Sequence, residues 1–261
     1  MKVLLIYPAP PKKFWPRGTF RSHWLPSGLA SIAGVLLRGG HDVRVHIREE
    51  QLVRNGFDWP AADAQLRQLI QEFGPDMVGF SMVSPAVAET ATVAQLVKDI
   101  LGRHVITVAG GPHPTAIPQQ TLTDCPALDA VAIGEAEDTM LDLADNGLSQ
   151  TTPGMVVRGD GTFITTPPRR AVADLDALPS VPYQLFDMDY YTQPSRWMIR
   201  WLNLSVANIR TSRGCTNRCR FCAGHLVSGL GVRMRSIESV LDQIDYVVSK
   251  FAAAAIHFET T

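Results

Sequence analysis

The sequence predicts an α/β protein: a doubly wound parallel sheet followed by the first units of a second, shorter β/α series. Five short apolar runs alternate with segments of helical periodicity in the N-terminal half, and this alternation is typical of a parallel sheet covered by helices. The first run, residues 3–7, has no polar residue at alternate positions, which indicates a strand buried on both faces. With 46% hydrophobic and 19% charged residues among 261, the chain has enough apolar residues for one large or two modest cores.

The elements of the first sheet are expected in regular order. Strands are predicted at residues 3–7, 42–47, 76–81, 105–111 and within 128–137, and helices at 26–40, 61–73 and around 93–101. The first strand ends at a run of prolines, because proline has no amide proton to donate to a neighbouring strand. The first helix has apolar residues at i, i+3, i+4, i+7 and i+8 and ends at Gly39 and Gly40.

Ligands of such sheets bind beyond the carboxyl ends of the strands. The long loop 8–26 and the segments SMVSP, GGPHPT and GEAED are expected there. The ligand-facing candidates in these segments are Ser81, Ser84, Gly110, Gly111, His113, Gly134 and Glu135. Equally, the glycines could only form a turn, the loop could cover a sheet edge, and a lone histidine is more often a hydrogen-bonded loop residue. Neither G-x-G-x-x-G after the first strand nor a P-loop motif is present, which argues against dinucleotide and P-loop sites.

Charge and cysteine content narrow the function classes. The formal net charge is −1, so no overall field favours nucleic acid or a membrane surface. The first apolar run is too short for a signal-peptide core, and no apolar span is long enough to cross a bilayer. These features predict a cytoplasmic protein without membrane insertion, in which clustered cysteines indicate metal binding or catalysis before disulfides.

A connector is predicted between two domains. Periodicity fades after about residue 150, where GMVVRGDGTFITTPPRR is typical of a small hairpin and a proline-punctuated aromatic stretch follows. The predicted organisation is a first domain at 1–149, a linker with a small hairpin at 150–204, and a second β/α region at 205–261. In that region a strand leads into a cysteine loop, and an amphipathic helix with Ser236 as N-cap precedes another strand.

The loop RTSRGCTNRCRFCAGH contains three of the four cysteines. Cys215, Cys219 and Cys222 form C-x3-C-x2-C, and three thiolates from one short loop suit three irons of a cubane cluster, with the fourth iron open. Zinc held by these thiols with His225, and an accidental grouping, are the alternatives. Cys125 lies far from the loop in sequence, and a buried structural thiol is its predicted role.

The chain resembles cobalamin-binding-domain-containing radical S-adenosylmethionine (SAM) proteins. The resemblance lies in SRGCTNRCRFC, in PSGLASIAGVLLRGGHDVRV, VAGGPHPTAIP and DAVAIGEAEDT of the first half, and in DLDALPSVPY of the connector. It implies a Rossmann-like cobalamin-binding domain, followed by the first part of a radical SAM partial β/α barrel.

The resemblance also implies cofactors and roles. The three clustered cysteines would ligate a 4Fe-4S cluster whose open iron chelates SAM, while Phe221 would pack beside the adenine and Glu259 would lie near the SAM amino group. The seven ligand-facing candidates above would contact cobalamin. Reductive cleavage of SAM would then serve methyl transfer, or cyclase-like radical chemistry, on a small-molecule substrate, with an electron donor such as flavodoxin or ferredoxin.

Two departures from the family pattern affect these expectations. The D-x-H-x-x-G loop, by which many cobalamin proteins supply a lower histidine ligand, is absent after the first strand. The sequence also stops at Thr261, within or just after the second strand of an expected barrel of about six, so we expect a fragment of a longer enzyme or a partner that completes it. A non-catalytic cofactor-binding module and a zinc-stapled structural domain are the competing functions.

Four arginines flank the cysteine loop, and the sequence leaves their role open. They are Arg210, Arg213, Arg233 and Arg235. They could offset the charge of an anionic cluster or pair with the carboxylate of SAM, or they could form a solvated rim.

Overall fold

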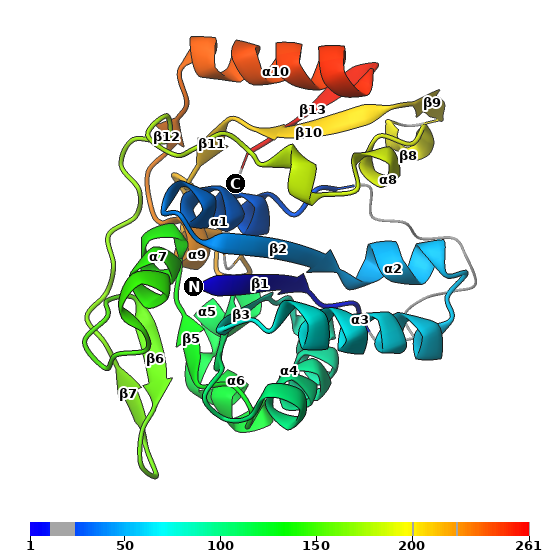
Figure 1. Ribbon diagram of the computed structural model, residues 1–261. Helices are drawn as coiled ribbons and strands as arrows, with labels where there is room; N and C mark the ends of the chain where they lie inside the picture. The colour runs from blue at the N-terminus through cyan, green and yellow to red at the C-terminus, as the bar shows by residue number, and fades with distance from the viewer. Residues whose placement is uncertain (11–23, 200, 223, 261) are drawn as a thin grey trace.

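The computed structural model describes residues 1–10, 24–199, 201–222 and 224–260, and its main sheet has the strand order β2-β1-β3-β4-β5-β6-β7 (Figure 1). The strands are β1 (Lys2–Tyr7), β2 (Asp42–Ile47), β3 (Met77–Ser81), β4 (Ile106–Gly110), β5 (Ala130–Ala132), β6 (Met155–Arg158) and β7 (Phe163–Thr165). Strands β1 to β5 pair in parallel. The prediction of a doubly wound parallel sheet is confirmed.

Helices cover both faces of this sheet (Figure 1). They are α1 (Ser27–Arg38), α2 (Arg48–Arg54), α3 (Trp59–Phe73), α4 (Val87–Leu101), α5 (Pro112–Ala116), α6 (Pro118–Asp124) and α7 (Glu137–Asn146). In β1, Leu5 packs in one core with α1 and α7, while Leu4 and Ile6 pack in the other with α3, α4 and α6. Successive side chains of a strand point to opposite faces, so an uninterrupted apolar run supplies both cores.

The hairpin of β6 and β7 belongs to the main sheet. Strand β6 pairs antiparallel with β5, and β7 pairs antiparallel with β6. The hairpin expected in the linker is therefore present, but it extends the first domain instead of standing within the connector. The physical reason is that Met155, Val156 and Val157 are all buried, and their pairing covers the edge that β5 would otherwise expose.

The C-terminal part contains the expected β/α unit. It comprises β10 (Val206–Arg210), β11 (Ser212–Arg213), α9 (Gly224–Ser228), β12 (Arg233–Met234), α10 (Ile237–Phe251) and β13 (Ala255–Glu259). Strands β10 and β13 are parallel neighbours, and Val247 of α10 packs in the same core as Ile209. The Ser236 side chain accepts a hydrogen bond from the Ser239 amide, which confirms the predicted N-cap.

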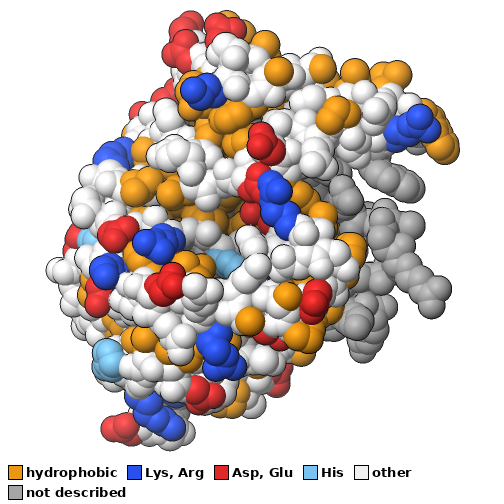
Figure 2. Space-filling view, turned by 45° about the vertical axis from the view of Figure 1, so that its right-hand side comes forward, with side chains coloured by type: hydrophobic (Ala, Val, Ile, Leu, Met, Phe, Trp, Pro, Cys, Tyr) orange, Lys and Arg blue, Asp and Glu red, His pale blue; other side chains and the backbone are white. Residues whose placement is uncertain are grey.

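Part of this unit exposes apolar side chains. Helix α10 exposes Ile237 and Leu241, and Phe258 is exposed on β13. Figure 2 shows hydrophobic side chains gathered along the upper part of the molecule, where α10 lies. Within the described residues, nothing covers this side of the unit.

The connector continues through η3 (Tyr183–Leu185) and α8 (Met188–Tyr191) to a hairpin of β8 (Ser195–Ile199) and β9 (Leu202–Leu204) that the sequence did not predict. Helix α8 is fastened to α2: the Tyr190 hydroxyl donates to Glu49 Oε1 at 3.0 Å, and Arg54 pairs with Asp187. The beginning of the connector helix is thereby fixed to the first domain. Beside these contacts, burial raises the pKa of Glu50 to about 7.

We expect Glu50→Gln to stabilise the protein at pH 8 and to have less effect at pH 5. A carboxyl with a raised folded-state pKa contributes stability while it is protonated, and this contribution is lost as the pH rises from the unfolded-state value of about 4.3 to the folded-state value. Glutamine keeps the shape and stays neutral. Thermal unfolding of both proteins across this range tests the expectation, and parallel pH profiles would contradict it.

Candidate functional site

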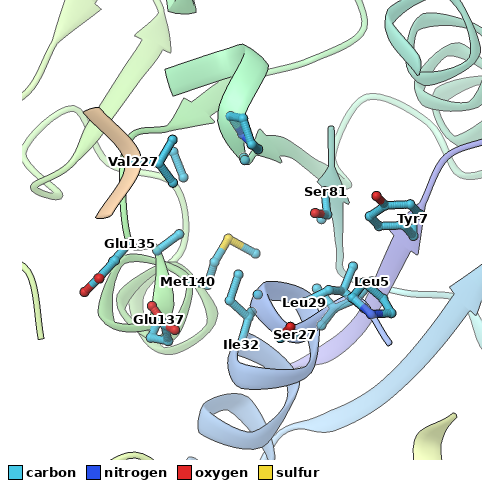
Figure 3. Close-up of a pocket in the computed structure, with 18 of the residues that line it drawn as sticks. Leu5, Tyr7, Ser27, Leu29, Ile32, Ser81, Glu135, Glu137, Met140 and Val227 are labelled. Carbon is cyan, nitrogen blue, oxygen red and sulfur yellow. The ribbon is translucent and has the colours of Figure 1, made fainter. Parts of the chain in front are cut away.

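A cavity of about 360 Å³ lies at the carboxyl ends of β1, β3, β4 and β5 (Figure 3). Strand order reverses between β1 and β3, and such a switch point is where open α/β sheets bind ligands. Four parts of the chain line the cavity: the strand ends with Tyr7 and Ser81, α1 with Ser27, Leu29 and Ile32, the β5–α7 region with Glu135, Glu137 and Met140, and the C-terminal part with Arg210, Arg213, Val227 and Glu259.

The cavity collects most of the residues that the sequence selected as ligand-facing. Those that line it are Ser81, Gly110, Gly111, Gly134 and Glu135. Ser84 and His113 are not among its lining residues, and they bind each other instead, with His113 Nδ1 2.9 Å from Ser84 Oγ. This contact matches the alternative of a hydrogen-bonded histidine, although His113 lies in α5 and not in a loop.

Glycines keep the floor of the cavity open. A Cβ added at Gly110 would meet nothing nearer than Ala132 at 3.8 Å, so a side chain at this position would extend into free space. At Gly111 the backbone φ is +104° and an added Cβ would lie 2.9 Å from the Met82 carbonyl oxygen. Only glycine fits there without strain. The absence of a side chain at Gly110 therefore leaves free space in the cavity, whereas Gly111 is required by the backbone.

Two buried carboxylates on the cavity wall join the first domain to the cysteine loop. Glu137 Oε1 accepts hydrogen bonds from Arg213 Nη2 at 2.6 Å and from Ser31 Oγ at 2.7 Å. Glu135 accepts two from Arg233, at 2.6 and 2.9 Å. We call these four charged residues the interdomain clamp. Figure 3 shows that the Glu135 side chain turns away from the centre of the cavity.

The interdomain clamp determines the charge state of Glu137. Burial alone would raise the pKa of this carboxyl, but the Arg213 guanidinium and the hydrogen bonds outweigh burial and lower it. The side chains of Arg213 and Glu137 are only 6% and 4% exposed, so the pair is shielded from water. Arg213 therefore does not belong to a solvated rim.

The clamp arginines also close the ends of the cysteine loop. Strands β11 and β12 form a short antiparallel ladder in which Arg213 lies opposite Arg233. Beyond it, the Gly231 amide donates to the Cys215 carbonyl at 3.0 Å, and a Cβ at Gly214 would lie 1.9 Å from the Gly231 oxygen. The two ends of the loop therefore lie in close contact, and this contact requires glycine at position 214. Arg213 and Arg233 fix both ends to the first domain.

Backbone amides in the loop point at two of its sulfur atoms. The Asn217 amide donates to Cys215 Sγ at 3.4 Å, and the Gly224 amide donates to Cys222 Sγ at 3.3 Å. Such N–H···S bonds stabilise thiolate ligands. Among the described residues, no three cysteine, histidine or acidic side chains are close enough to share one metal ion. The donor set of three thiols with amide support fits an iron-sulfur cluster, which would have to draw the sulfurs together.

Two other sequence predictions concern single side chains. Phe221 is 93% exposed, so nothing in the described part of the chain covers its ring. Cys125 is fully buried, its Sγ lies 3.7 Å from the Val87 carbonyl oxygen, and burial raises its pKa to about 11. The prediction of a buried structural thiol is confirmed.

Glu259 lies where the two domains meet. It ends β13 opposite Arg210, the last residue of β10. Its carboxylate accepts hydrogen bonds from the Ser27 hydroxyl and the Asn208 amide, while Asn208 Oδ1 accepts from the Leu25 amide at 3.1 Å. The sequence alone did not indicate this grouping, because the parallel register of β10 and β13 creates it.

Comparisons with known proteins agree with this geometry. Residues 17–144 match the family model of the B12 binding domain. The uncharacterized methyltransferase PH0819 of Pyrococcus horikoshii is 30% identical over 263 residues, which cover 99% of this chain and 53% of that protein. An anaerobic magnesium-protoporphyrin IX monomethyl ester cyclase of Rubrivivax gelatinosus is 26% identical over 265 residues, covering 96% of this chain and 43% of that protein.

A solved structure shares the fold over the whole chain. The radical SAM methyltransferase TsrM from Kitasatospora setae, solved with cobalamin and a [4Fe-4S] cluster bound, superposes with a TM-score of 0.70 at 17% identity, covering 100% of this chain and 48% of that one. The chain thus spans about half the length of the relatives it matches. In the part of the chain that the structure describes, no helix is long and apolar enough to cross a membrane.

The fold is that of an α/β protein with a cavity at its topological switch point. The comparisons add that residues 17–144 match the B12 binding domain and that the chain is related to cobalamin-dependent radical SAM methyltransferases and to cyclases.

Proposed function

We propose that the chain provides the cobalamin site and the cluster loop of a radical SAM enzyme. The reaction would be methyl transfer or related radical chemistry on an unactivated carbon of a small molecule. The observation that carries this proposal is that the cysteine loop and the cavity share residues. Arg213 lies just before Cys215 and Val227 lies just after Cys222, and both line the cavity at the switch point. Two cofactors placed there would face each other.

Residues of the first domain would hold cobalamin. Gly110 and Gly134 would leave space for the corrin ring, and the hydroxyls of Tyr7 and Ser81 would donate to its polar rim. None of the described lining residues is a histidine, which supports binding without a lower histidine ligand from this wall.

Residues of the cysteine loop would hold the cluster. Bound there, the cluster would supply the single electron for reductive cleavage of SAM, drawn from a donor such as flavodoxin or ferredoxin. The Asn217 and Gly224 amides would stabilise the ligating thiolates, and the exposed Phe221 ring would be free to pack beside the adenine. The interdomain clamp would hold the loop against the cavity and help to keep water out.

We expect Gly110→Val to weaken cobalamin binding at least tenfold while the fold is retained. The valine side chain would enter the cavity without straining the backbone, and valine suits a strand. Titration with hydroxocobalamin, followed by absorption, measures the affinity. Thr165→Val on the exposed side of β7 is the control, and equal affinities in the two variants would contradict the assignment of the cavity.

A cofactor-binding module without chemistry is the second candidate. It is favoured by the separation of the three thiols, which leaves no preformed metal group in the described residues. Metal and sulfide analysis after anaerobic reconstitution separates the candidates. Corrinoid binding, with no iron or with a cluster whose electron paramagnetic resonance signal SAM does not change, supports the module, and zinc without iron supports a zinc-stapled domain.

A further inference from the structure

Helix α9 connects the cysteine loop to the cavity. It begins at Gly224, whose backbone amide donates to Cys222 Sγ at 3.3 Å. Its last two residues are Ser228 and Val227, which both line the cavity of about 360 Å³ (Figure 3). An α-helix rises about 1.5 Å per residue, so these five residues span only about 7.5 Å. One short element therefore contacts a sulfur of the loop at one end and the cavity at the other.

Arg233 holds the end of α9 that faces the cavity. Its Nη2 donates at 2.6 Å to the carbonyl oxygen of Ser228, a helix-terminal group that has no partner within the helix. The same guanidinium binds both oxygens of Glu135 on the cavity wall, at 2.6 and 2.9 Å, and donates to the Val172 carbonyl of the connector. The side chain of Arg233 is 19% exposed and that of Glu135 is 6% exposed, so these contacts are largely shielded from water. Arg233 thus fastens α9 to the first domain.

The position of α9 depends on contacts beyond the helix itself. Isolated helices shorter than about 12 residues are marginal in water, and α9 has five. On the cavity side, the Val227 carbonyl oxygen would lie 3.5 Å from a Cβ added at Gly134, so the helix packs against the backbone that follows β5. A ligand in the cavity would add contacts at this end of α9, and a metal centre that draws the cysteine sulfurs together would constrain the other end. Either occupant would therefore stabilise the helix in place.

We propose that α9 couples the cavity to the cysteine loop and that Arg233 is the positioning residue for this coupling. The proposal rests on the proposed function, because it takes the cavity to bind cobalamin and the loop to bind a cluster. By linkage, the factor by which one occupant raises the affinity for the other is returned in equal measure. Arg233 does not line the cavity, so it acts through α9 and Glu135. Lysine cannot replace it, because an ammonium lacks the planar fork that binds the Glu135 carboxylate and two carbonyls at once.

Hydrogen exchange followed by mass spectrometry tests the coupling in the iron-free chain. We expect saturating hydroxocobalamin to slow exchange about fivefold or more in wild-type peptides that cover residues 215–222, none of which lines the cavity. Arg233→Lys should bind the corrinoid and lose this protection. Arg169→Lys is the matched control and should keep it, since Arg169 is 17% exposed and binds Asp142 and the Pro153 carbonyl instead of the cysteine loop. Unchanged exchange in corrinoid-bound wild type overturns the proposal, whether or not the variants fold, and full protection in Arg233→Lys overturns the role of Arg233.

The reverse measurement separates this proposal from the proposed function. The affinity for hydroxocobalamin is measured by equilibrium dialysis with cobalt analysis, before and after anaerobic assembly of the cluster. We expect binding about fivefold or more tighter after assembly in wild type and in Arg169→Lys, and equal affinities in Arg233→Lys. Equal affinities in wild type overturn the coupling but leave both sites in place, so the proposed function survives. A wild-type chain that binds no corrinoid or assembles no cluster overturns the proposed function, and the coupling with it.

Discussion

Cys219→Ala is expected to abolish cluster assembly in the reconstituted chain. The wild-type loop should hold about four irons with sulfide, and three thiolates are the minimum for a cubane with one open iron. Cys219 is the central ligand of C-x3-C-x2-C, and its carbonyl oxygen also accepts the Cys222 amide at 3.1 Å. Iron analysis and the absorption of the reconstituted protein measure the loss.

Cys125→Ala is the control for this variant. Its thiol is buried and has a raised pKa, so its removal should leave iron content unchanged and cost on the order of 1 kcal/mol of stability through the small cavity it creates. A full cluster in Cys219→Ala, or loss of iron in Cys125→Ala, would refute the ligand assignment.

Glu137→Ala is expected to destabilise the protein by about 3 kcal/mol, because it leaves the buried Arg213 charge with only a longer ion pair, from Nη1 to Glu135 Oε2 at 3.6 Å. Chemical denaturation measures the effect. Replacing both partners, with Glu137→Leu and Arg213→Met together, should restore most of the stability, since no buried charge then remains unpaired. Glu238→Ala, on the exposed first turn of α10, should change stability by less than about 0.5 kcal/mol.

Glu137 should also contribute to acid unfolding. Its pKa is lowered in the folded state, so its contribution is present above the unfolded-state value of about 4.3 and is lost as the pH falls through the folded-state value. Glu137→Gln should therefore lose less stability than wild type on acidification. Identical acid profiles for the two proteins would exclude this role.

Local sequence patterns were sufficient for the main elements of the fold. Uninterrupted apolar runs located β1, β3 and β4, and helical spacing located α1, α3 and α10, because these signals depend only on neighbouring residues. Helix α2 was missed, since β2 passes directly into it at Ile47 without proline, glycine or a side-chain cap. The β6–β7 hairpin was found, but its attachment to β5 depends on pairing that no local pattern contains.

The candidate site was only partly predictable for the same reason. The position of Glu135 after a strand placed it correctly at the cavity, yet its carboxylate binds Arg233, 98 residues away in the chain. The spacing of the three clustered cysteines was sufficient by itself to predict a cluster-binding loop. The four arginines that flank the cysteine loop pair with different carboxylates in the folded protein. These pairings depend on tertiary structure, so the sequence alone could not assign a role to each arginine.

The most direct test of a cluster loop with an open iron is electron paramagnetic resonance of the anaerobically reconstituted, reduced chain, with and without SAM. We predict a 4Fe-4S signal that changes when SAM is added, because three cysteines leave one iron free to bind it. A cluster signal that is identical with and without SAM, or reconstituted protein that contains no iron, would contradict the proposed function.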